Sequence, residues 1–250
     1  MIYFFSYGDD NYRNSKIRIE QEAKNSRMFD HIKIYGREHI DIEFLSKTKP
    51  YIDMPRGGGY WLWKPFLIKK TFDMMNEGDY CVYADAGCTI NPNGKDRLHY
   101  YFQLMDKEDT GIFRFFFRGT KELTSTSHKV FEFFGVDKDI NFMSSDHLMA
   151  TVMIFKKCKN SIEFVDKYYD IAISNPDLFS DKYDDYVVNN EFKNHRHDQS
   201  ISSCLVKLGK FTTISDETYS PDDGATPIPE GFRYLYLVRK VPFLATRIRN

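Results

Sequence analysis

Short apolar runs alternate with polar, helix-forming stretches from the first residues of the chain. The run Ile2–Ser6 is bulky and mostly apolar, and the turn-forming stretch YGDD follows it. Residues 15–27 are polar and rich in helix formers, and His31–Tyr35 is a second apolar run. A strand, a helix and a strand in this order predict a parallel βαβ unit.

A loop and an amphipathic helix come next. Residues 50–59 contain two prolines and three consecutive glycines, which predicts a loop: a mobile lid, a tight approach of the backbone, or a plain flexible connection. From Tyr60 to Asn76 apolar side chains return at helical spacing, and Pro65 falls in the first turn, where its missing N–H costs little. One face of this predicted helix carries Leu67, Ile68, Thr71, Phe72 and Met75.

The rest of the chain continues the alternation of strands and helices. Apolar runs predict strands, and apolar faces at helical spacing predict helices. The strands are Tyr80–Ala84, Gly111–Phe117, Ala150–Phe155 and Phe211–Ile214, and the helices are His128–Phe134, Ser161–Ile173 and Gln199–Leu208. This pattern, which has no internal repeat or linker, predicts one α/β domain over residues 1–250, with a mainly parallel central sheet and helices on both faces.

Composition narrows the possible partners and surroundings. The formal net charge is −1, whereas nucleic-acid binding usually demands a strong basic excess, so we expect no nucleic-acid partner. The first residues lack a basic lead, and no stretch approaches the roughly 20 apolar residues of a transmembrane helix. The four cysteines show neither a CxxC pair nor a metal-type spacing, which favours reduced thiols. We therefore expect a soluble, cytoplasmic protein without a transmembrane segment.

A single acidic residue marks the end of an apolar strand. Asp85 follows Tyr80–Ala84 directly, and the small residues Ala86 and Gly87 come next. In an open parallel sheet, ligands bind beyond the carboxyl ends of the strands. A carboxylate at this place suits a divalent cation that bridges to phosphate oxygens. The alternative interpretation of Asp85 is a turn residue that caps the strand.

Two sequence segments support the interpretation of Asp85 as a ligand-binding residue. RGGGYWLWKPFLIKKTF stands a short way before GDYCVYADAGC, and together they resemble glycosyltransferases of the GT-A fold, in which a strand ends in an Asp-x-Asp motif. WLWKP and YADAGC resemble small bacterial and viral members in particular, and the resemblance runs from Met1 to about Leu208. It implies a Rossmann-like GT-A domain. The implied reaction moves a hexose or pentose from a nucleoside-diphosphate sugar, most often a UDP-sugar, to a hydroxyl of a glycan or another acceptor.

One position departs from the family motif. Asp85 matches the first aspartate, but Gly87 stands where the second would be. Because one carboxylate binds a divalent cation more weakly than two, either another residue completes a Mn²⁺ or Mg²⁺ site, or the dependence on metal is loose or absent. The resemblance implies that a late histidine, His195 or His197, completes the site. These two are spaced two apart, so we expect only one to be engaged, and we assign Asp85 and His197 as the metal ligands.

The resemblance also implies a set of donor-binding residues. The nucleotide would lie over the end of the first strand, and the diphosphate would meet Asp85 with help from Lys64, unless Lys64 is an ordinary solvated side chain. Trp61 and Trp63 are two apart and cannot both face the core of one helix. At least one of them is therefore expected to stack on a sugar or base, or else to be partly buried at the surface. The donor-binding set is Tyr7, Gly8, Trp61, Lys64, Asp85, Ala86 and Gly87.

A second polar cluster, NHRHDQS, leads into the helix predicted at Gln199–Leu208. Asp198 would lie at the N-terminus of that helix, where a carboxylate is favoured, so helix capping is one interpretation. Similar transferases carry an Asp-Gln pair before a late helix, and this resemblance implies that Asp198 is the catalytic carboxylate and that Gln199 lines the acceptor and sugar pocket. Asp198 would take the acceptor's proton in an inverting enzyme, or steady an oxocarbenium-like centre in a retaining one.

Further polar residues have two interpretations each. Asp146 and His147 precede a strand, and the resemblance implies a place in the acceptor and sugar pocket, although a surface turn explains them as well. One of Arg114 and Arg118 could reach a phosphate. The basic tail is best explained as a solvated terminus, and the alternative is that it covers the diphosphate or touches an anionic membrane. The tail residues are Arg239, Lys240, Arg247 and Arg249.

Two other functions remain possible for such a sheet. A nucleotidyltransferase that makes sugar nucleotides should carry a glycine-rich basic loop after the first strand, and the acidic stretch YGDD argues against it. The lost second aspartate suggests instead a non-catalytic module that binds nucleotide sugars. Turnover of nucleotide sugars, with and without Mn²⁺, separates the two.

Overall fold

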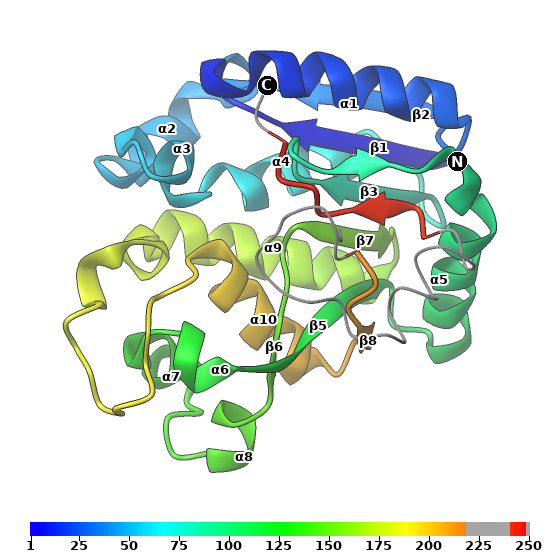
Figure 1. Cartoon of the computed structure of the whole chain (residues 1–250). Helices are drawn as coiled ribbons and strands as arrows, with labels where there is room; N and C mark the ends of the chain where they lie inside the picture. The colour runs from blue at the N-terminus through cyan, green and yellow to red at the C-terminus, as the bar shows by residue number, and fades with distance from the viewer. Residues whose placement is uncertain (219–240, 249–250) are drawn as a thin grey trace.

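The computed structural model describes residues 1–218 and 241–248, and its centre is a seven-stranded sheet (Figure 1). The strands are β1 Ile2–Tyr7, β2 His31–Tyr35, β3 Tyr80–Ala84, β5 Ile112–Lys121, β6 Asp146–Leu148, β7 Val152–Lys156 and β8 Thr212–Ser215. They run in the order β2-β1-β3-β7-β5-β6, and β8 also pairs with β5. β6 and β7 are antiparallel to β5, whereas β1, β2, β3, β5 and β8 share one direction, so the sheet is mainly parallel.

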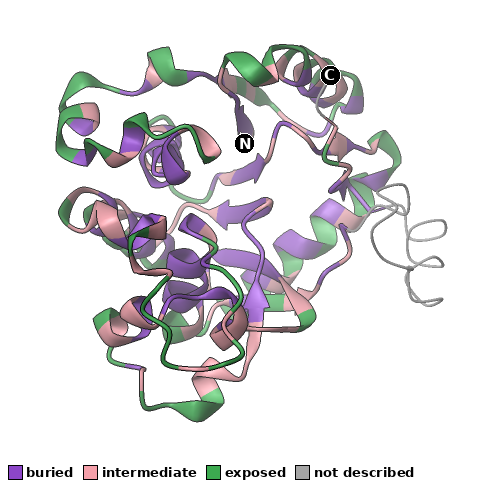
Figure 2. Ribbon diagram, turned by 60° about the vertical axis from the view of Figure 1, so that its left-hand side comes forward, coloured by how far each residue is buried: buried purple, intermediate pink, exposed green. Residues whose placement is uncertain are grey.

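Neighbouring residues of each central strand face opposite sides of the sheet, as the pleat requires. Phe4 of β1 and Ala84 of β3 belong to one core cluster, and Phe5 and Tyr83 belong to the other. The long helices are α1 Arg13–Ser26, α4 Trp63–Asp73, α5 Lys95–Glu108, α9 Lys159–Ser174 and α10 Asp198–Gly209. α1 and α5 pack on the first cluster, and α4, α9 and α10 pack on the second. Figure 2 shows the buried strands between helices whose outer surfaces are exposed.

Shorter elements fill the connections. The short helices are α2 Ile42–Thr48, α3 Gly57–Tyr60, α6 Glu122–Ser125, α7 His128–Phe134 and α8 Ile140–Met143. The 3₁₀ turns are η1 Asp10–Tyr12, η2 Arg37–His39, η3 Tyr51–Asp53, η4 Pro92–Gly94, η5 Pro176–Phe179 and η6 Asp181–Tyr183. A second, small antiparallel pair joins β4 Thr89–Ile90 to β9 Phe243–Leu244 near the end of the chain.

The fold class predicted from the sequence is confirmed. β1, α1 and β2 form the expected parallel unit, in which Tyr3 of β1 pairs with His31 of β2. β2, β3 and α7 have the predicted bounds. The helix expected from Tyr60 begins instead at Trp63, because Tyr60 and Trp61 have φ of 54° and 58°, in the left-handed region.

Several elements were not predicted, among them the long helix α5 and the short strand β6. α5 carries Leu98, Tyr101, Phe102 and Met105 on its buried face, so its helical spacing was present in the sequence. β6 is only three residues long, and its strand pairing is set by β5 rather than by any local pattern. In the part of the chain that the structure describes, no helix is both long and apolar enough to cross a bilayer.

The packing of α4 gives a prediction about stability. Leu67 is fully buried, so Leu67→Ala should lower the free energy of unfolding by about 2–5 kcal/mol, because it removes buried methyl groups and leaves a cavity. Ile42 is 85% exposed, and Ile42→Ala should change the same quantity by less than about 0.5 kcal/mol. Urea unfolding followed by circular dichroism measures both variants, and equal effects would contradict the burial of α4.

Candidate active site

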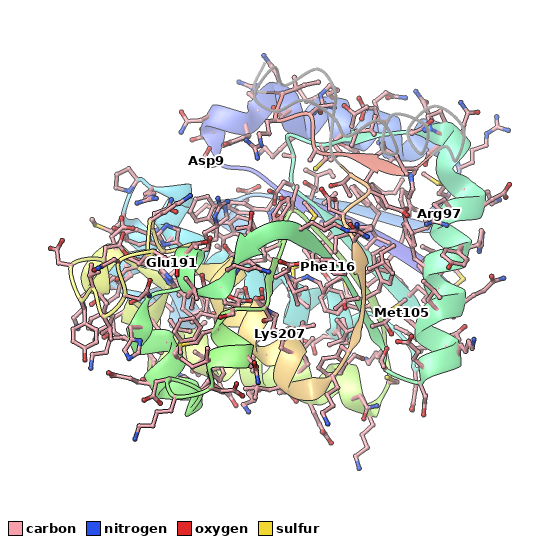
Figure 3. The ribbon with its side chains drawn as sticks, turned by 60° about the horizontal axis from the view of Figure 1, so that its bottom comes forward. Asp9, Arg97, Met105, Phe116, Glu191 and Lys207 are labelled. Carbon is pink, nitrogen blue, oxygen red and sulfur yellow. The ribbon has the colours of Figure 1, made fainter. Side chains whose placement is uncertain are left out.

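A cleft of about 550 Å³ opens at the carboxyl ends of β1 and β3. We call it the larger cleft. Asp9, which is labelled in Figure 3, lies on its wall, where β1 gives way to η1 and α1. Its lining also includes Tyr7, Gly8, Asn11, Tyr12, Arg56, Gly57, Gly58, Trp61, Trp63, Asp85, Ala86, Gly87 and Arg247. Of the seven residues predicted to bind the donor, all but Lys64 line this cleft.

Stacked aromatic rings form part of the wall of the larger cleft. The rings of Tyr7 and Trp63 lie 3.9 Å apart at 24°, and the Trp63 Nε1–H donates to the carbonyl of Gly57 at 3.0 Å. Gly57, Gly58 and Gly59 all have positive φ, and a Cβ on Gly59 would lie 2.4 Å from the Ile52 carbonyl oxygen. The glycine run is therefore a tight turn that only glycine accommodates, and it brings backbone up to the aromatic wall.

A second cleft of about 240 Å³ adjoins the first, and we call it the smaller cleft. Arg56, Trp61, Asp85 and Thr151 line both. The smaller cleft is also lined by Lys64, Ala150, Asn194, His195, Arg196, His197, Asp198 and Gln199. Asp85 therefore stands where the two clefts meet.

The backbone and the side chain of Asp85 both make hydrogen bonds. Its backbone N–H donates to Thr151 O at 2.9 Å, and the Tyr83 hydroxyl donates to Oδ1. The Lys64 ammonium lies 3.8 Å from the same oxygen. Loss of water around the carboxylate raises its pKa, while Lys64 and the Tyr83 hydrogen bond act in the opposite direction. The carboxylate is 38% exposed, so it can still meet a ligand.

Lys64 is the buried cation of the site. Its side chain is 2% exposed, its ammonium pairs with Asp198 Oδ2 at 2.7 Å, and it donates to Ala150 O at 3.2 Å. The interpretation of Lys64 as a solvated residue is therefore wrong. Because it carries positive charge between Asp85 and Asp198, it offsets the repulsion between two carboxylates that line one cleft.

Asp198 is the first residue of α10, and the N-cap is His197, which has φ 52° and ψ −124°. This conformation is costly for a residue with a side chain, and such strain is found most often at functional sites. The Asp198 side chain makes no cap hydrogen bond that we find within residues 1–218 and 241–248, and its Oδ2 faces Lys64 instead. Burial raises the pKa of Asp198, and Lys64 opposes that shift.

The two histidines beside Asp198 differ in whether both of their ring nitrogens make hydrogen bonds. His195 accepts the Ser127 N–H at Nδ1 and donates from Nε2 to the Leu178 carbonyl at 2.8 Å, so both ring nitrogens are engaged. His197 donates from Nδ1 to the Phe179 carbonyl at 2.9 Å, which leaves the Nε2 lone pair unshared. Burial lowers the pKa of His195 to about 3 and that of His197 to about 4, so both rings are neutral at pH 7.

The residues that line the clefts do not form a divalent-cation site. Among residues 1–218 and 241–248, no three His, Cys, Asp or Glu side chains come together in a way that could hold a metal ion. Asp85 Oδ1 is already engaged by Tyr83 and Lys64, and Gly87 supplies no second carboxylate. His197 Nε2 lies 3.6 Å from Asp181 Oδ1, but Asp181 lines neither cleft and pairs with Arg56 at 2.7 Å. Within the described residues, this donor set therefore suits neither Mn²⁺ nor Mg²⁺.

Four further candidates lie outside both clefts, namely Asp146, His147, Arg114 and Arg118. His147 is fully buried, with Nδ1 2.7 Å from Glu122 Oε2, and Lys207 of α10 (Figure 3) pairs with the same carboxylate. Asp146 pairs with Lys121 at 2.8 Å. The predicted place of Asp146 and His147 in the sugar pocket is not supported, because neither lines a cleft: His147 is buried beside Glu122 and α10, and the partly exposed Asp146 pairs with Lys121 of β5.

The predicted roles of the arginines are also revised. Arg114 is buried and donates from Nε to the Met149 carbonyl at 2.9 Å, and Arg118 donates to the Ser215 hydroxyl, so neither lines a cleft. In the basic tail, Arg247 is exposed, and it also lines the larger cleft. The tail residues outside the described part of the chain are Arg239, Lys240 and Arg249.

Several lining residues were missed from the sequence. Arg56 and Thr151 line both clefts, and Asp9 and Asn11 line the larger one. Asp9 and Asn11 carried a usable signal, since they follow the predicted end of β1. Thr151 carried none, because the break between β6 and β7 places it there.

The buried Lys64–Asp198 pair gives a prediction about stability and pH. Lys64→Met should lower the free energy of unfolding by about 3–5 kcal/mol at pH 7, because it leaves a buried carboxylate without a partner. The folded-state pKa of Asp198 is raised, so the stability linked to it is present in full below pH 3.8 and is lost as pH rises through the folded value.

The variant should therefore recover stability relative to the parent between pH 7 and pH 4.5. Urea unfolding at both pH values measures this, and Lys47→Met, which breaks an exposed pair with Glu43, is the control with no expected change in the midpoint. A Lys64→Met midpoint equal to the parent's at pH 7 would contradict the buried pair.

No protein-family model matches the chain, and no curated protein resembles it in sequence. Among solved structures, a glycosyltransferase involved in the glycosylation of the major capsid of PBCV-1 gives a TM-score of 0.47 at 10% identity, over 97% of this chain and 92% of that one. Mouse xyloside xylosyltransferase 1 in its apo form gives 0.46 at 10% identity, over 98% and 97%. The apo form of the glycosyltransferase GlyE of Streptococcus pneumoniae TIGR4 gives 0.43 at 16% identity, over 98% and 54%. This likeness concerns the path of the chain, so function is argued from the side chains of the two clefts.

Proposed function

We propose that this chain is a GT-A-like glycosyltransferase that moves a sugar from a nucleoside-diphosphate sugar, in the first place a UDP-sugar, to a hydroxyl of a glycan or another acceptor. The observation that carries the proposal is the meeting of two clefts at Asp85, above the buried pair of Lys64 and Asp198. The place is the one where open α/β sheets bind ligands, beyond the carboxyl ends of β1 and β3.

The two clefts suit the two parts of such a donor. The larger cleft has an aromatic wall in which Tyr7 and Trp63 are stacked on each other and buried, whereas Trp61 is partly exposed and could stack on a base. The polar side chains of Asp9 and Asn11 line the same cleft. The smaller cleft is lined mainly by polar residues, and its polar groups include the His197 Nε2 and the Gln199 amide, which have no hydrogen-bond partner among the described residues. Such groups hydrogen-bond sugar hydroxyls, so the diphosphate would lie between the clefts and the sugar would lie in the smaller one.

The reaction breaks the bond between the anomeric carbon of the sugar and the β-phosphate oxygen. The electron pair leaves with the phosphate, and the acceptor oxygen forms the new bond to the anomeric carbon. Asp198 is the buried carboxylate of the smaller cleft; burial raises its pKa, and the Lys64 ammonium favours its ionised form. In an inverting course it takes the acceptor's proton. In a retaining course its charge steadies the oxocarbenium-like carbon, and the acceptor's proton goes to the departing phosphate oxygen. The anomeric configuration of the product distinguishes the two.

The first test removes the carboxylate at the junction. Asp85→Ala should lower the turnover of the donor by at least about 100-fold and leave the fold intact, because the half-exposed side chain serves the ligand more than the core. The control is Asp106→Ala, which removes a similar tyrosine–aspartate hydrogen bond outside the clefts, from Tyr80 to α5. Release of UDP or GDP from a panel of nucleotide sugars measures turnover, and a parent-like rate for Asp85→Ala would remove Asp85 from the site.

The second test separates catalysis from helix capping. Asp198→Asn should slow transfer by about 100-fold or more, while the Kd for donor changes by less than about threefold. The control is Asp41→Asn, because Asp41 caps α2 by accepting the Phe44 N–H at 2.7 Å and lies outside both clefts. Losses of similar size in transfer and in donor binding would show that Asp198 has a structural role.

The same measurements decide between the proposal and its rivals. A parent protein that binds nucleotide sugars without turnover is a binding module. One that forms a sugar nucleotide from a sugar phosphate and a nucleoside triphosphate is a nucleotidyltransferase. Either result would replace the transferase assignment.

A further inference from the structure

The end of the described chain lies across the residue that departs from the Asp-x-Asp motif. β9 pairs with β4, so that Thr89 faces Leu244, and the chain then continues past Gly87 toward α1 (Figure 1). The carbonyl of Gly87 accepts the Ile248 N–H at 3.0 Å and the Thr246 hydroxyl at 2.9 Å. We call residues 245–248 the crossing segment.

The crossing segment fills the space that a side chain at Gly87 would need. A Cβ on Gly87 would lie 3.2 Å from Arg247 Cα and 3.4 Å from its carbonyl carbon. A side chain at this position would be in tighter than ordinary contact, so the crossing segment would have to shift by a few tenths of an ångström to admit it. The close approach, and not the backbone dihedrals, is what favours glycine at Gly87, since its φ is outside the left-handed region.

The crossing segment brings a cation in place of the missing carboxylate. Arg247 lines the larger cleft together with Asp85 and Gly87. The positive charge of Arg247 acts to lower the pKa of Asp85, against the effect of burial. It also acts to lower the pKa of Arg196 in the smaller cleft, so the electrostatic field of Arg247 reaches both side chains. Arg247 is exposed, and we find no ion pair or side-chain hydrogen bond from it to residues 1–218 or 241–248.

Two other cations near Asp85 already have partners. Lys64 is paired with Asp198 at 2.7 Å and bonded to the Ala150 carbonyl. Arg56 pairs with Asp181 at 2.7 Å. Of these three cations, Arg247 is therefore the one whose charged group, within the described part of the chain, is available to an incoming anion.

We propose that Arg247 binds the donor diphosphate beside Asp85, at the place of the missing second aspartate, and that transfer therefore needs no divalent cation. The inference rests on the proposed function. When the bond between the anomeric carbon and the β-phosphate oxygen breaks, the nucleoside diphosphate leaves with the electron pair and one more negative charge. The guanidinium neutralises that charge through paired N–H donors and stays protonated throughout. Asp85 then accepts hydrogen bonds from hydroxyls of the donor.

The test measures the binding of UDP and of uridine by calorimetry, in EDTA and in Mn²⁺, to the parent and three variants. The Kd of the parent for UDP in EDTA should be within about threefold of its value in Mn²⁺. Arg247→Gln should weaken UDP binding by roughly 10-fold or more and leave uridine binding unchanged, and Arg247→Lys should restore part of the loss. Lys210→Gln is the matched control, because Lys210 is an exposed cation with φ 54°, close to the 53° of Arg247, and lies on α10's far end.

The outcomes separate this inference from the proposed function. UDP binding or sugar transfer that disappears in EDTA and returns with Mn²⁺ would overturn the inference and leave the transferase assignment standing. Equal Kd values for UDP in Arg247→Gln and Lys210→Gln would overturn it as well. A parent that binds neither UDP nor GDP and turns over no nucleotide sugar would instead overturn the proposed function and the inference with it.

Discussion

The arrangement of the site depends on the contacts that the Lys64 ammonium makes. It lies 2.7 Å from Asp198 Oδ2 and 3.8 Å from Asp85 Oδ1, and it donates to the Ala150 carbonyl. Through it α4, the end of β3, the start of α10 and the link between β6 and β7 meet at one charge. Without that charge, two carboxylates would share a poorly solvated space and would repel each other.

A buried ion pair of this kind is weak evidence for stability, because the loss of water around both charges offsets most of their attraction. In this structure, the effect of the ion pair is on the charge and the position of the side chains around it. Lys64 favours the ionised form of Asp198 against the effect of burial, and its ammonium also lies 3.8 Å from Asp85 at the junction of the clefts. The fold therefore supplies a pair of oriented carboxylates, and the arrangement of their charges is set before any ligand arrives.

The sequence predicted the parts of this arrangement that depend on local pattern. Strand ends are visible as abrupt changes from apolar to small or acidic residues, so the place of Asp85 followed from the end of β3. The burial of Lys64 did not follow, because it depends on how α4 packs under β3. His147 was misplaced for a similar reason, since its partner Glu122 stands at the end of β5, 25 residues away in the sequence. Arg247 reaches the cleft only because β9 returns to β4, and its sequence neighbourhood carries no sign of that pairing.

The wall between the clefts shows the same dependence on distant contacts. Tyr60, Trp61 and His197 all have positive φ, which is unfavourable for residues with side chains. Their rings lie together, with the His197 ring 5.2 Å from each of the other two. Contacts among the three rings oppose the relaxation of each backbone to an ordinary conformation. Trp61 lines both clefts and His197 lines the smaller one, so this strained group of rings borders both clefts. Tyr60 belongs to α3 and His197 is the N-cap of α10, so this part of the cleft wall depends on how two elements far apart in the sequence pack together.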